Sequence, residues 1–310
     1  MPDLDILLQQ ILNGLVLGSV YALVALGYTM VYGILQLINF AHGEVLMVGA
    51  MVGVTVVSAL GGAGLPGPVV LLLAIGAAIP VCIALSLLIE RVAYRPLRHA
   101  PKLAPLITAI GLSIVIQTLA MIVWKPNPIV FPDLLPTEPV RIGGAVLAPK
   151  QVLILGVSAL LMAGLMLLVN RTRLGRAMRA TAENPRIAGL MGVNANQVIA
   201  ATFAIGAALA AVAGVLVAMN YNIAQFSMGF IPGLKAFTAA VLGGIGNLAG
   251  AVVGGLLLGL IESLGAGYIG DLTGGFLGSH YQDIFAFVVL IAVLVLRPSG
   301  IMGERVADRA

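Results

Sequence analysis

Two carboxylates, Glu44 and Glu262, stand inside long apolar segments of the sequence. An ionisable group is costly in such a segment and by default marks a functional site. His42 and Glu44 follow Asn39 at an expected helix break, where a carboxylate satisfies free N–H groups at the start of the next helix. We expect capping or hydrogen bonding within the bundle, with direct substrate contact as the alternative. Lys235 begins a short apolar stretch, and we expect its ammonium to reach the membrane interface.

The chain lacks the sequence motifs that several kinds of chemistry require. No GxxxxGK[ST] loop is present, so ATP must be handled by another protein. GxSxG and HExxH motifs are also absent, and the three histidines, His42, His99 and His280, are far apart. Cys82 stands alone, which excludes a disulfide within the chain and a multi-cysteine metal site. We therefore expect no catalytic residues and no bound metal or cofactor, and an intramembrane enzyme is poorly supported.

The composition is that of an integral membrane protein. The chain has 310 residues, of which 60% are hydrophobic and 9% charged, and its mean hydropathy is +1.10. Ordinary soluble domains carry about 25% charged residues. Four stretches contain no charge at all, those between residues 44 and 90, 102 and 125, 150 and 171, and 186 and 235. Each is long enough for one or two helices, since ~20 residues cross a hydrocarbon core of ~30 Å.

The apolar segments predict an all-α polytopic membrane protein, a bundle of about eight or nine transmembrane helices. They are continuously apolar, whereas the strands of a membrane β-barrel alternate in polarity. Residues 231–247 are apolar but short, and form either a short span or a re-entrant hairpin. The whole chain, residues 1–310, reads as one transmembrane domain. The expected helices lie near residues 6–32, 44–60, 68–90, 103–124, 151–170, 197–219, 249–268 and 280–297.

Basic residues predict the orientation. The formal charge of +4 reflects arginines and lysines that gather between spans, as expected for cytoplasmic loops, so no nucleic-acid partner is indicated. Residues 91–102 and 171–197 are strongly basic and should be cytoplasmic, whereas the proline-rich stretch 125–150 should be external. The N-terminus is then outside, and its acidic start is unlike a cleaved signal peptide. The C-terminal tail, with Arg297, Arg305 and Arg309, is cytoplasmic if residues 231–247 cross fully.

Small residues recur at the spacing that close helix packing requires. Lipid supplies no hydrophobic drive between helices, so close backbone contact must provide dispersion energy instead. We expect tight packing at four GxxxG pairs, Gly14 and Gly18, Gly49 and Gly53, Gly250 and Gly254, and Gly255 and Gly259.

The basic stretch 171–197 is too apolar for an ordinary solvated loop. Its first part, up to Ala182, predicts an amphipathic helix, and Pro185 then interrupts the pattern. A solvated surface loop does not need the large apolar side chains found here, whereas a helix that docks on a partner protein uses such side chains for contact. These side chains are Leu174, Met178, Ile187, Leu190 and Met191.

Several stretches carry a family resemblance. AENPRIAGLMGVN, in the basic loop, resembles the EAA-type coupling loop of ATP-binding-cassette (ABC) importer permeases, with AEN where the general motif has EAA. INFAHGEVLMVGA at 38–50 and KAFTAAVLGGIGNLAGAVVGGLLLGLIES at 235–263 resemble the H-type permease of branched-chain amino-acid importers. The resemblance continues from LNGLVLGSVYALVALGYTMVYG at 12–33 to LRPSGIMG at 296–303.

The resemblance implies a permease subunit in the bacterial inner membrane. Such importers contain two homologous permeases, two cytoplasmic ATPases that use ATP, and a periplasmic binding protein. Their substrates are leucine, isoleucine and valine, while relatives handle urea, short amides or aromatic acids. The sequence leaves open whether the two permeases are identical. The coupling residues carried over from the motif are Arg179, Glu183, Gly189 and Gly192, with Glu183 as the foremost docking contact.

A neutral, apolar substrate calls for a passage lined by apolar and neutral polar groups. The polar candidates are Gln36, Asn39, His42, Glu44, Gln117, Asn220 and Asn222. The main alternative is a secondary transporter or channel in which Glu44 or Glu262 couples uptake to an ion. The coupling-like loop favours the ABC importer.

Overall fold

The computed structural model describes most of the chain, namely residues 2–98, 100–101, 103–136, 138–142, 144–273, 282–297 and 299–303. Some residues that entered the sequence argument lie outside the described ranges: His99, Lys102, His280, Arg305 and Arg309.

Helices dominate the described residues. The helices are α1 (Pro2–Leu35), α2 (His42–Leu60), α3 (Gly67–Ile89), the π-helical turn η1 (Glu90–Tyr94), α4 (Arg95–Leu97), α5 (Leu103–Trp124), α6 (Pro149–Arg171), α7 (Arg173–Glu183), α8 (Pro185–Leu190), α9 (Ala195–Tyr221), α10 (Phe230–Gly243), α11 (Leu248–Leu272) and α12 (Gln282–Leu296). The short strands are β1 (Ile129–Val130), β2 (Val140–Ile142), β3 (Ala145–Leu147) and β4 (Ile223–Ala224). They form two antiparallel pairs, β1 with β4 and β2 with β3.

The prediction of an all-α polytopic membrane protein is confirmed. Seven helices in the described part are long and apolar enough to cross a membrane, and they correspond to the first seven expected spans. Two further apolar stretches are shorter than a full span, residues 230–243 of α10 and residues 287–296 of α12. The latter occupies the position of the eighth expected helix.

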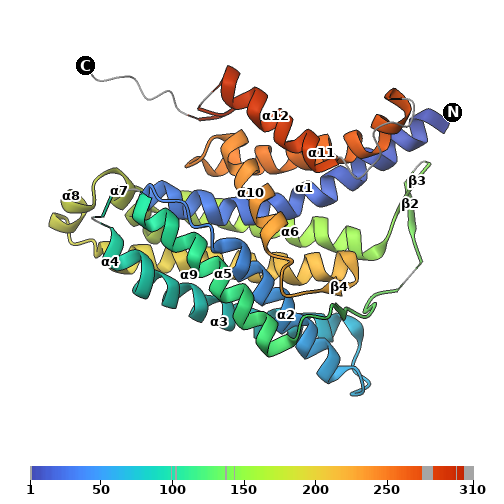
Figure 1. The fold of residues 1–310 in the computed structure, drawn as a ribbon, viewed down its shortest axis with the longest axis horizontal. Coiled ribbons are helices and arrows are strands. Elements are labelled where there is room, and N and C mark those ends of the chain that lie inside the picture. Colours follow the sequence, from blue (N-terminus) through green and yellow to red (C-terminus); the bar gives the residue numbers. More distant parts are fainter. Residues whose placement is uncertain are drawn as a thin grey trace.

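The long helices run side by side between two ends of the molecule (Figure 1). One end carries α7 and α8, and we call it the coupling end. The other carries the start of α1 and the pair β2–β3, and we call it the N-terminal end. Gln9 of α1 donates to the carbonyl of Val146 in β3 at 3.0 Å, which ties these two elements together.

The segment between α9 and α11 passes from one end to the other. Strand β4 pairs with β1 at the N-terminal end, whereas Gly246 and Leu248 share a cavity with Arg179 of α7 at the coupling end. Helix α10 has 14 residues, about 21 Å at 1.5 Å per residue, so it covers only part of a ~30 Å core. The non-helical residues on either side of α10 cover the remaining distance between the two ends. Of the two forms expected for residues 231–247, the structure therefore shows the short span.

The end of the described chain returns to the coupling end. The backbone N–H groups of Ile301 and Met302 each donate at 2.9 Å, to the carbonyls of Leu242 and Gly243 at the end of α10. The Asn247 amide also donates to the Met302 carbonyl at 2.9 Å. Residues 299–303 therefore lie beside the end of α10, near the coupling end. The cytoplasmic position expected for the tail that follows stays a prediction.

The predicted glycine spacings lie at close helix contacts. Gly14 and Gly18 of α1 face α11, where a Cβ on Gly18 would lie 2.8 Å from the Gly255 carbonyl oxygen. A Cβ on Gly49 of α2 would lie 2.7 Å from Ala211 Cα of α9. Only glycine, whose side chain is a single hydrogen atom, permits two helix backbones to approach so closely.

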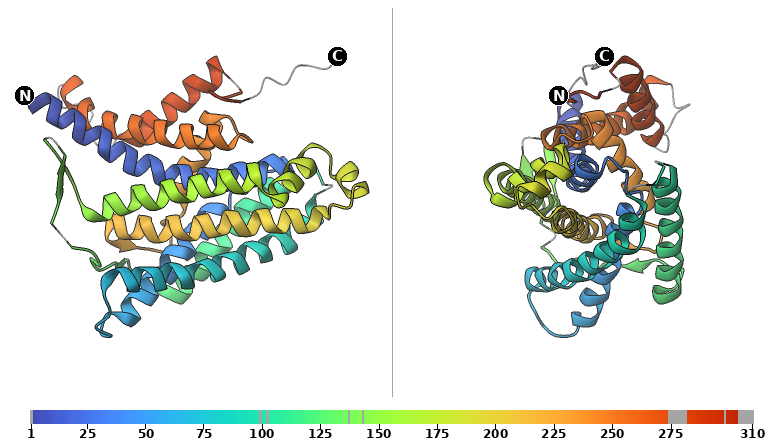
Figure 2. Two further views of the ribbon diagram at one scale, coloured as in Figure 1. Left: turned by 180° about the vertical axis from the view of Figure 1, so that it is seen from behind. Right: turned by 90° about the vertical axis from the view of Figure 1, so that its left-hand side faces the viewer.

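Helices α1, α2 and α9 form the interior of the bundle. Most of each is buried, whereas the spans of α3, α5 and α6 are largely exposed. Figure 2 (right) shows α5 standing apart at one side, with α11 and α12 on another. The exposed side chains of α5 are almost all aliphatic, which suits contact with lipid or with an apolar partner surface.

Candidate translocation site and coupling segment

Lys235 of α10 is enclosed by carboxylates from two other helices. Its Nζ lies 3.0 Å from Glu262 Oε1 on α11 and 2.7 Å from Asp283 Oδ1 on α12. The Tyr21 hydroxyl of α1 donates to Glu262 Oε2 at 2.9 Å. Lys235 exposes 5% of its surface, so the expectation that it reaches the interface was wrong. The two carboxylates offset the cost of burying its ammonium.

The sequence contained one signal for this cluster. Lys235 and Glu262 carry opposite charges in neighbouring apolar segments, and isolated charges at membrane depth usually pair with one another. Sequence reasoning treated the two residues separately and did not single out Asp283 or Tyr21. Their contribution depends on how α1 and α12 pack, which no local motif encodes.

A cavity of about 240 Å³ adjoins the cluster. Asn220, one of the predicted passage residues, lies in its wall near the C-terminal end of α9. Apart from Lys235 and Asp283, the wall is aliphatic, aromatic or neutral. The lining residues are Val16, Leu17, Val20, Tyr21, Val217, Asn220, Tyr221, Ile231, Pro232, Lys235 and Asp283.

Glu44 lies in the first turn of α2 and is bound by α5. It accepts hydrogen bonds from Ser113 Oγ at 2.9 Å and from Gln117 Nε2 at 2.7 Å, and it exposes only 1% of its surface. Glu44 therefore hydrogen-bonds within the bundle, one of the structural roles expected for it. Two predicted passage residues, Glu44 and Gln117, are brought together here.

The starts of α2 and α10 meet beside Glu44. A Cβ on Gly43 would lie 2.6 Å from the Gly229 carbonyl oxygen, so these backbones are in close contact. A smaller cavity of about 60 Å³ lies at this junction, lined by residues of α1, α2, α5 and α10. Helix N-termini carry partial positive charge, so the Glu44 carboxylate is favourably placed near both.

His42 and Asn39 are buried at the break before α2. The His42 ring packs edge-on against Tyr28, with 4.9 Å between ring centroids, and fills the space left by Gly27. The Tyr94 hydroxyl donates to Asn39 Oδ1 at 3.1 Å. These contacts anchor the break in the bundle interior.

The remaining predicted passage residues lie at the ends of the molecule. Gln36 is exposed at the end of α1, with a φ of +53° where the chain turns. Asn222 ends α9 in the left-handed region, at a φ of 57°, and donates to Asp133 Oδ1 at 2.6 Å. It also binds the ammonium of Lys150. The seven candidates thus fall into separate places: Glu44 with Gln117, Asn39 with His42, Asn220 in the larger cavity, and Gln36 and Asn222 at opposite ends.

The basic stretch 171–197 forms two short helices, α7 and α8. Thr172 Oγ1 accepts the backbone N–H of Gly175 at the start of α7. Asn184 separates the two helices and caps α8 through the N–H groups of Arg186 and Ile187. The predicted break at Pro185 is thus a junction, since proline occupies the first turn of α8, where its missing N–H costs nothing.

The apolar side chains of this stretch divide between two faces. Met178 is buried against the bundle, whereas Ile187, Leu190 and Met191 are 58%, 83% and 80% exposed. Three large exposed apolar groups at positions i, i+3 and i+4 are typical of a protein interaction surface. We call them the α8 apolar face.

The predicted coupling residues differ in where they point. Arg179 donates to the Val169 carbonyl of α6 and lines a cavity of about 110 Å³ beside α1, so its guanidinium contacts the bundle. Glu183 is exposed at the end of α7 and has no side-chain bond within the described residues. Gly189 is also exposed, with open space around it. Glu183 and Gly189 are therefore accessible to a partner. Arg179 is also exposed, but its bond to the Val169 carbonyl holds α7 against α6.

Gly192 terminates α8. Its φ of +85° lies in the left-handed region, and the N–H of Val193 reaches back to the Ala188 carbonyl at 3.0 Å. This is the glycine-terminated ending that favours glycine for lack of a Cβ. Gly192 thus sets the direction in which the chain leaves the α8 apolar face.

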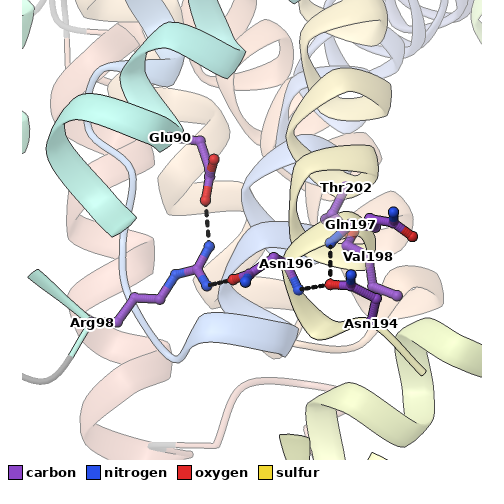
Figure 3. Close-up of polar contacts among 7 residues, drawn as sticks. All are labelled: Glu90, Arg98, Asn194, Asn196, Gln197, Val198 and Thr202. Atoms are coloured by element: carbon purple, nitrogen blue, oxygen red, sulfur yellow. Dashed lines mark hydrogen bonds and ion pairs between the residues drawn. The ribbon is translucent and has the colours of Figure 1, made fainter. Parts of the chain in front are cut away.

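A polar cluster joins the other basic segment to the start of α9 (Figure 3). Arg98 Nη1 donates to Asn196 Oδ1 at 2.6 Å, and its Nη2 pairs with Glu90. Asn194 Oδ1 caps α9 by accepting the N–H groups of Asn196 at 3.1 Å and Gln197 at 3.3 Å. The two basic segments, predicted to share one side of the membrane, therefore lie at one end of the molecule.

Comparison with known proteins gives near-complete matches. The family described as "Branched-chain amino acid transport system / permease component" matches residues 10–294. The high-affinity branched-chain amino acid transport system permease protein BraD of Pseudomonas aeruginosa is 49% identical, over 98% of each chain. The corresponding protein LivH of Escherichia coli is 44% identical over 96% of each. A probable branched-chain amino acid transport permease protein LivH of Methanocaldococcus jannaschii is 30% identical, over 95% of this chain and 92% of that one.

Proposed function

The chain belongs to the family of branched-chain amino acid transport permeases, and on this premise we propose that it carries leucine, isoleucine and valine across the membrane as part of an ABC importer. The near-full-length similarity to BraD carries this proposal. Seven apolar helices, and a cavity whose wall is mostly aliphatic, support it.

The importer contains further subunits in this proposal. A second, homologous permease completes the passage, two ATPases bind and hydrolyse ATP, and a periplasmic protein delivers the amino acid. The chain has no phosphate-binding GxxxxGK[ST] loop, so ATP hydrolysis resides in the partners. The chain itself contributes a conduit and is not an enzyme.

The coupling end faces the cytoplasm in this proposal. Positive charge favours the cytoplasmic side, and both strongly basic segments lie at the coupling end. The N-terminus is then outside, and the C-terminal segment, bound to the end of α10, is inside. The membrane is the bacterial inner membrane.

Coupling follows from the position of α7 and α8. The α8 apolar face and the Glu183 carboxylate are accessible at the coupling end and dock in a groove on an ATPase. When ATP binding closes the two ATPases, they displace α7 and α8 together. Arg179 passes that displacement to α6, whose Val169 carbonyl it binds. A helix pair with two discrete positions is the element that such coupling requires.

Uptake by the purified assembly in proteoliposomes tests the function. We expect uptake of leucine, isoleucine and valine that needs both ATP and the binding protein. The alternative, ion coupling through Glu44 or Glu262, predicts uptake that continues without ATP and stops when a protonophore dissipates the gradient. That second pattern would refute the ABC assignment.

Cysteines introduced at Glu183 and Leu65 test orientation, since the first should react only from the inside and the second only from the outside.

A further inference from the structure

The cavity beside Lys235 has the charges that an amino acid needs. Its lining contains one cation, Lys235, and one anion, Asp283, and the rest is mainly aliphatic. We propose that this cavity binds the zwitterion during transport, with its carboxylate on Lys235 and its ammonium on Asp283. The proposal rests on the function given above and specifies the site within it.

The charge arrangement permits the zwitterion to enter without leaving a buried charge unpaired. Asp283 has a side chain that is 42% exposed, so it can separate from Lys235 and follow an incoming ammonium. Lys235 keeps Glu262 behind the cavity wall, where the Tyr21 hydroxyl also binds that carboxylate. Breaking a buried ion pair is costly when one partner is left alone. Here the pair between Lys235 and Asp283 is replaced by two pairs, one between Lys235 and the substrate carboxylate and one between Asp283 and the substrate ammonium.

The apolar wall accounts for the side chain of the substrate. Five aliphatic residues and a proline line the cavity, from α1, α9 and α10. This part of the wall holds a branched aliphatic group and provides no hydrogen-bond partner for a polar one. The residues concerned are Val16, Leu17, Val20, Val217, Ile231 and Pro232.

The size of the cavity agrees with a small amino acid. Its volume of about 240 Å³ is far larger than the ~10–15 Å³ that a single water molecule requires, so the cavity has room for a solute of several heavy atoms. Tyr221 lies at the exposed end of the lining, where α9 approaches the N-terminal end. The cavity is therefore placed to receive substrate from the side on which the binding protein docks. Conduction requires that the site release its cargo, so its affinity should be low.

Protection of an introduced cysteine tests the site directly. Ile231→Cys puts a thiol in the cavity wall, and Cys82→Ser removes the native thiol while keeping a hydroxyl for the Val45 carbonyl. The assembly is studied without binding protein, both nucleotide-free and with ATP. Its reaction with a small methanethiosulfonate is followed as L-leucine is added. We expect leucine to slow the reaction several-fold in at least one state.

Matched probes separate the two charge contacts. Isocaproate has the carboxylate and side chain of leucine without its ammonium, and isoamylamine has the ammonium without the carboxylate. Each should protect less than leucine. Asp283→Asn should reduce protection by leucine to the level given by isocaproate. Should that variant fail to assemble, Leu17→Phe narrows the aliphatic wall and should weaken protection by leucine more than by alanine.

A control cysteine tests for non-specific effects. Leu135→Cys lies in a different cavity, formed by the loop before β2 and the start of α6, and should react equally with and without leucine. Equal protection at both positions, or none at Ile231→Cys in an assembly that transports leucine, would overturn the site. Failure of the wild-type assembly to transport leucine would instead overturn the proposed function.

Discussion

The Arg98 guanidinium donates a 2.6 Å hydrogen bond to Asn196 Oδ1 and also pairs with Glu90 (Figure 3). It therefore joins the segment after α3 to the first turn of α9. Helix α9 directly follows α8, so this bond fixes one end of the coupling segment to the bundle. A displacement of α7 and α8 must act against it.

Arg98→Ala should lower the stability of the permease. The variant leaves Glu90, which is 5% exposed, without its cation, and a buried acceptor that loses its partner costs about 1–3 kcal/mol. The expected result is a lower melting temperature in detergent, measured by fluorescence-detected size exclusion after heating. Arg91→Ala removes an exposed arginine of the same segment and should have little effect. Equal melting temperatures for the two variants would show that the Arg98 contacts are not stabilising.

Lys235→Met should be far more damaging than a change of one lipid-facing residue. It leaves Glu262 buried without a cation, and breaking a buried ion pair typically costs about 3–5 kcal/mol. We expect poor recovery of the folded permease. The double variant Lys235→Met with Glu262→Leu removes both charges and should recover part of the lost stability. If the double variant were no better than the single one, the pair would not be the cause.

The sequence predicted those features that depend on local composition. Helix α5 is bounded by residues 103 and 124 in both prediction and structure, because charges or prolines flank a continuous apolar run. The ion pairs of Lys235 were missed because they depend on how three successive helices, α10, α11 and α12, pack against one another. The predicted passage residues lie in separate parts of the structure for the same reason. Polarity identified side chains such as Gln36 and Asn222, but their depth in the bundle is set by where each helix begins and ends.

Gly255→Ala should separate α1 from α11. A Cβ at this position would lie 2.5 Å from the backbone nitrogen of Ala22, so the helices would have to move apart. Overpacking of this kind typically costs about 1–3 kcal/mol. Gly76→Ala is the matched control on α3, because a Cβ there meets nothing within 4 Å. We expect thermal unfolding in detergent to occur at lower temperature for the first variant alone, and an unchanged midpoint for Gly255→Ala would contradict the close contact.

Leu190→Asp should weaken binding of the ATPase while leaving the permease folded. Leu190 is 83% exposed and touches the bundle little, so the change should not alter the melting temperature. An aspartate in the α8 apolar face would be desolvated without a partner on docking. We expect at least a tenfold loss of affinity, about 1.4 kcal/mol, measured by co-purification at graded ATPase concentrations. Two further substitutions near this face, Glu183→Lys and Gly189→Trp, should reduce transport more than they reduce membrane insertion.

The control for docking is the same substitution at the other end. Leu65→Asp alters an exposed leucine just before α3, on the side proposed to face the periplasm. It should leave ATPase co-purification unchanged, because α7 and α8 lie at the opposite end of the bundle. If Leu65→Asp weakened ATPase binding as much as Leu190→Asp, the loss would reflect general damage. If neither variant changed it, the ATPase would contact the permease elsewhere, and the coupling role of the α8 apolar face would be wrong.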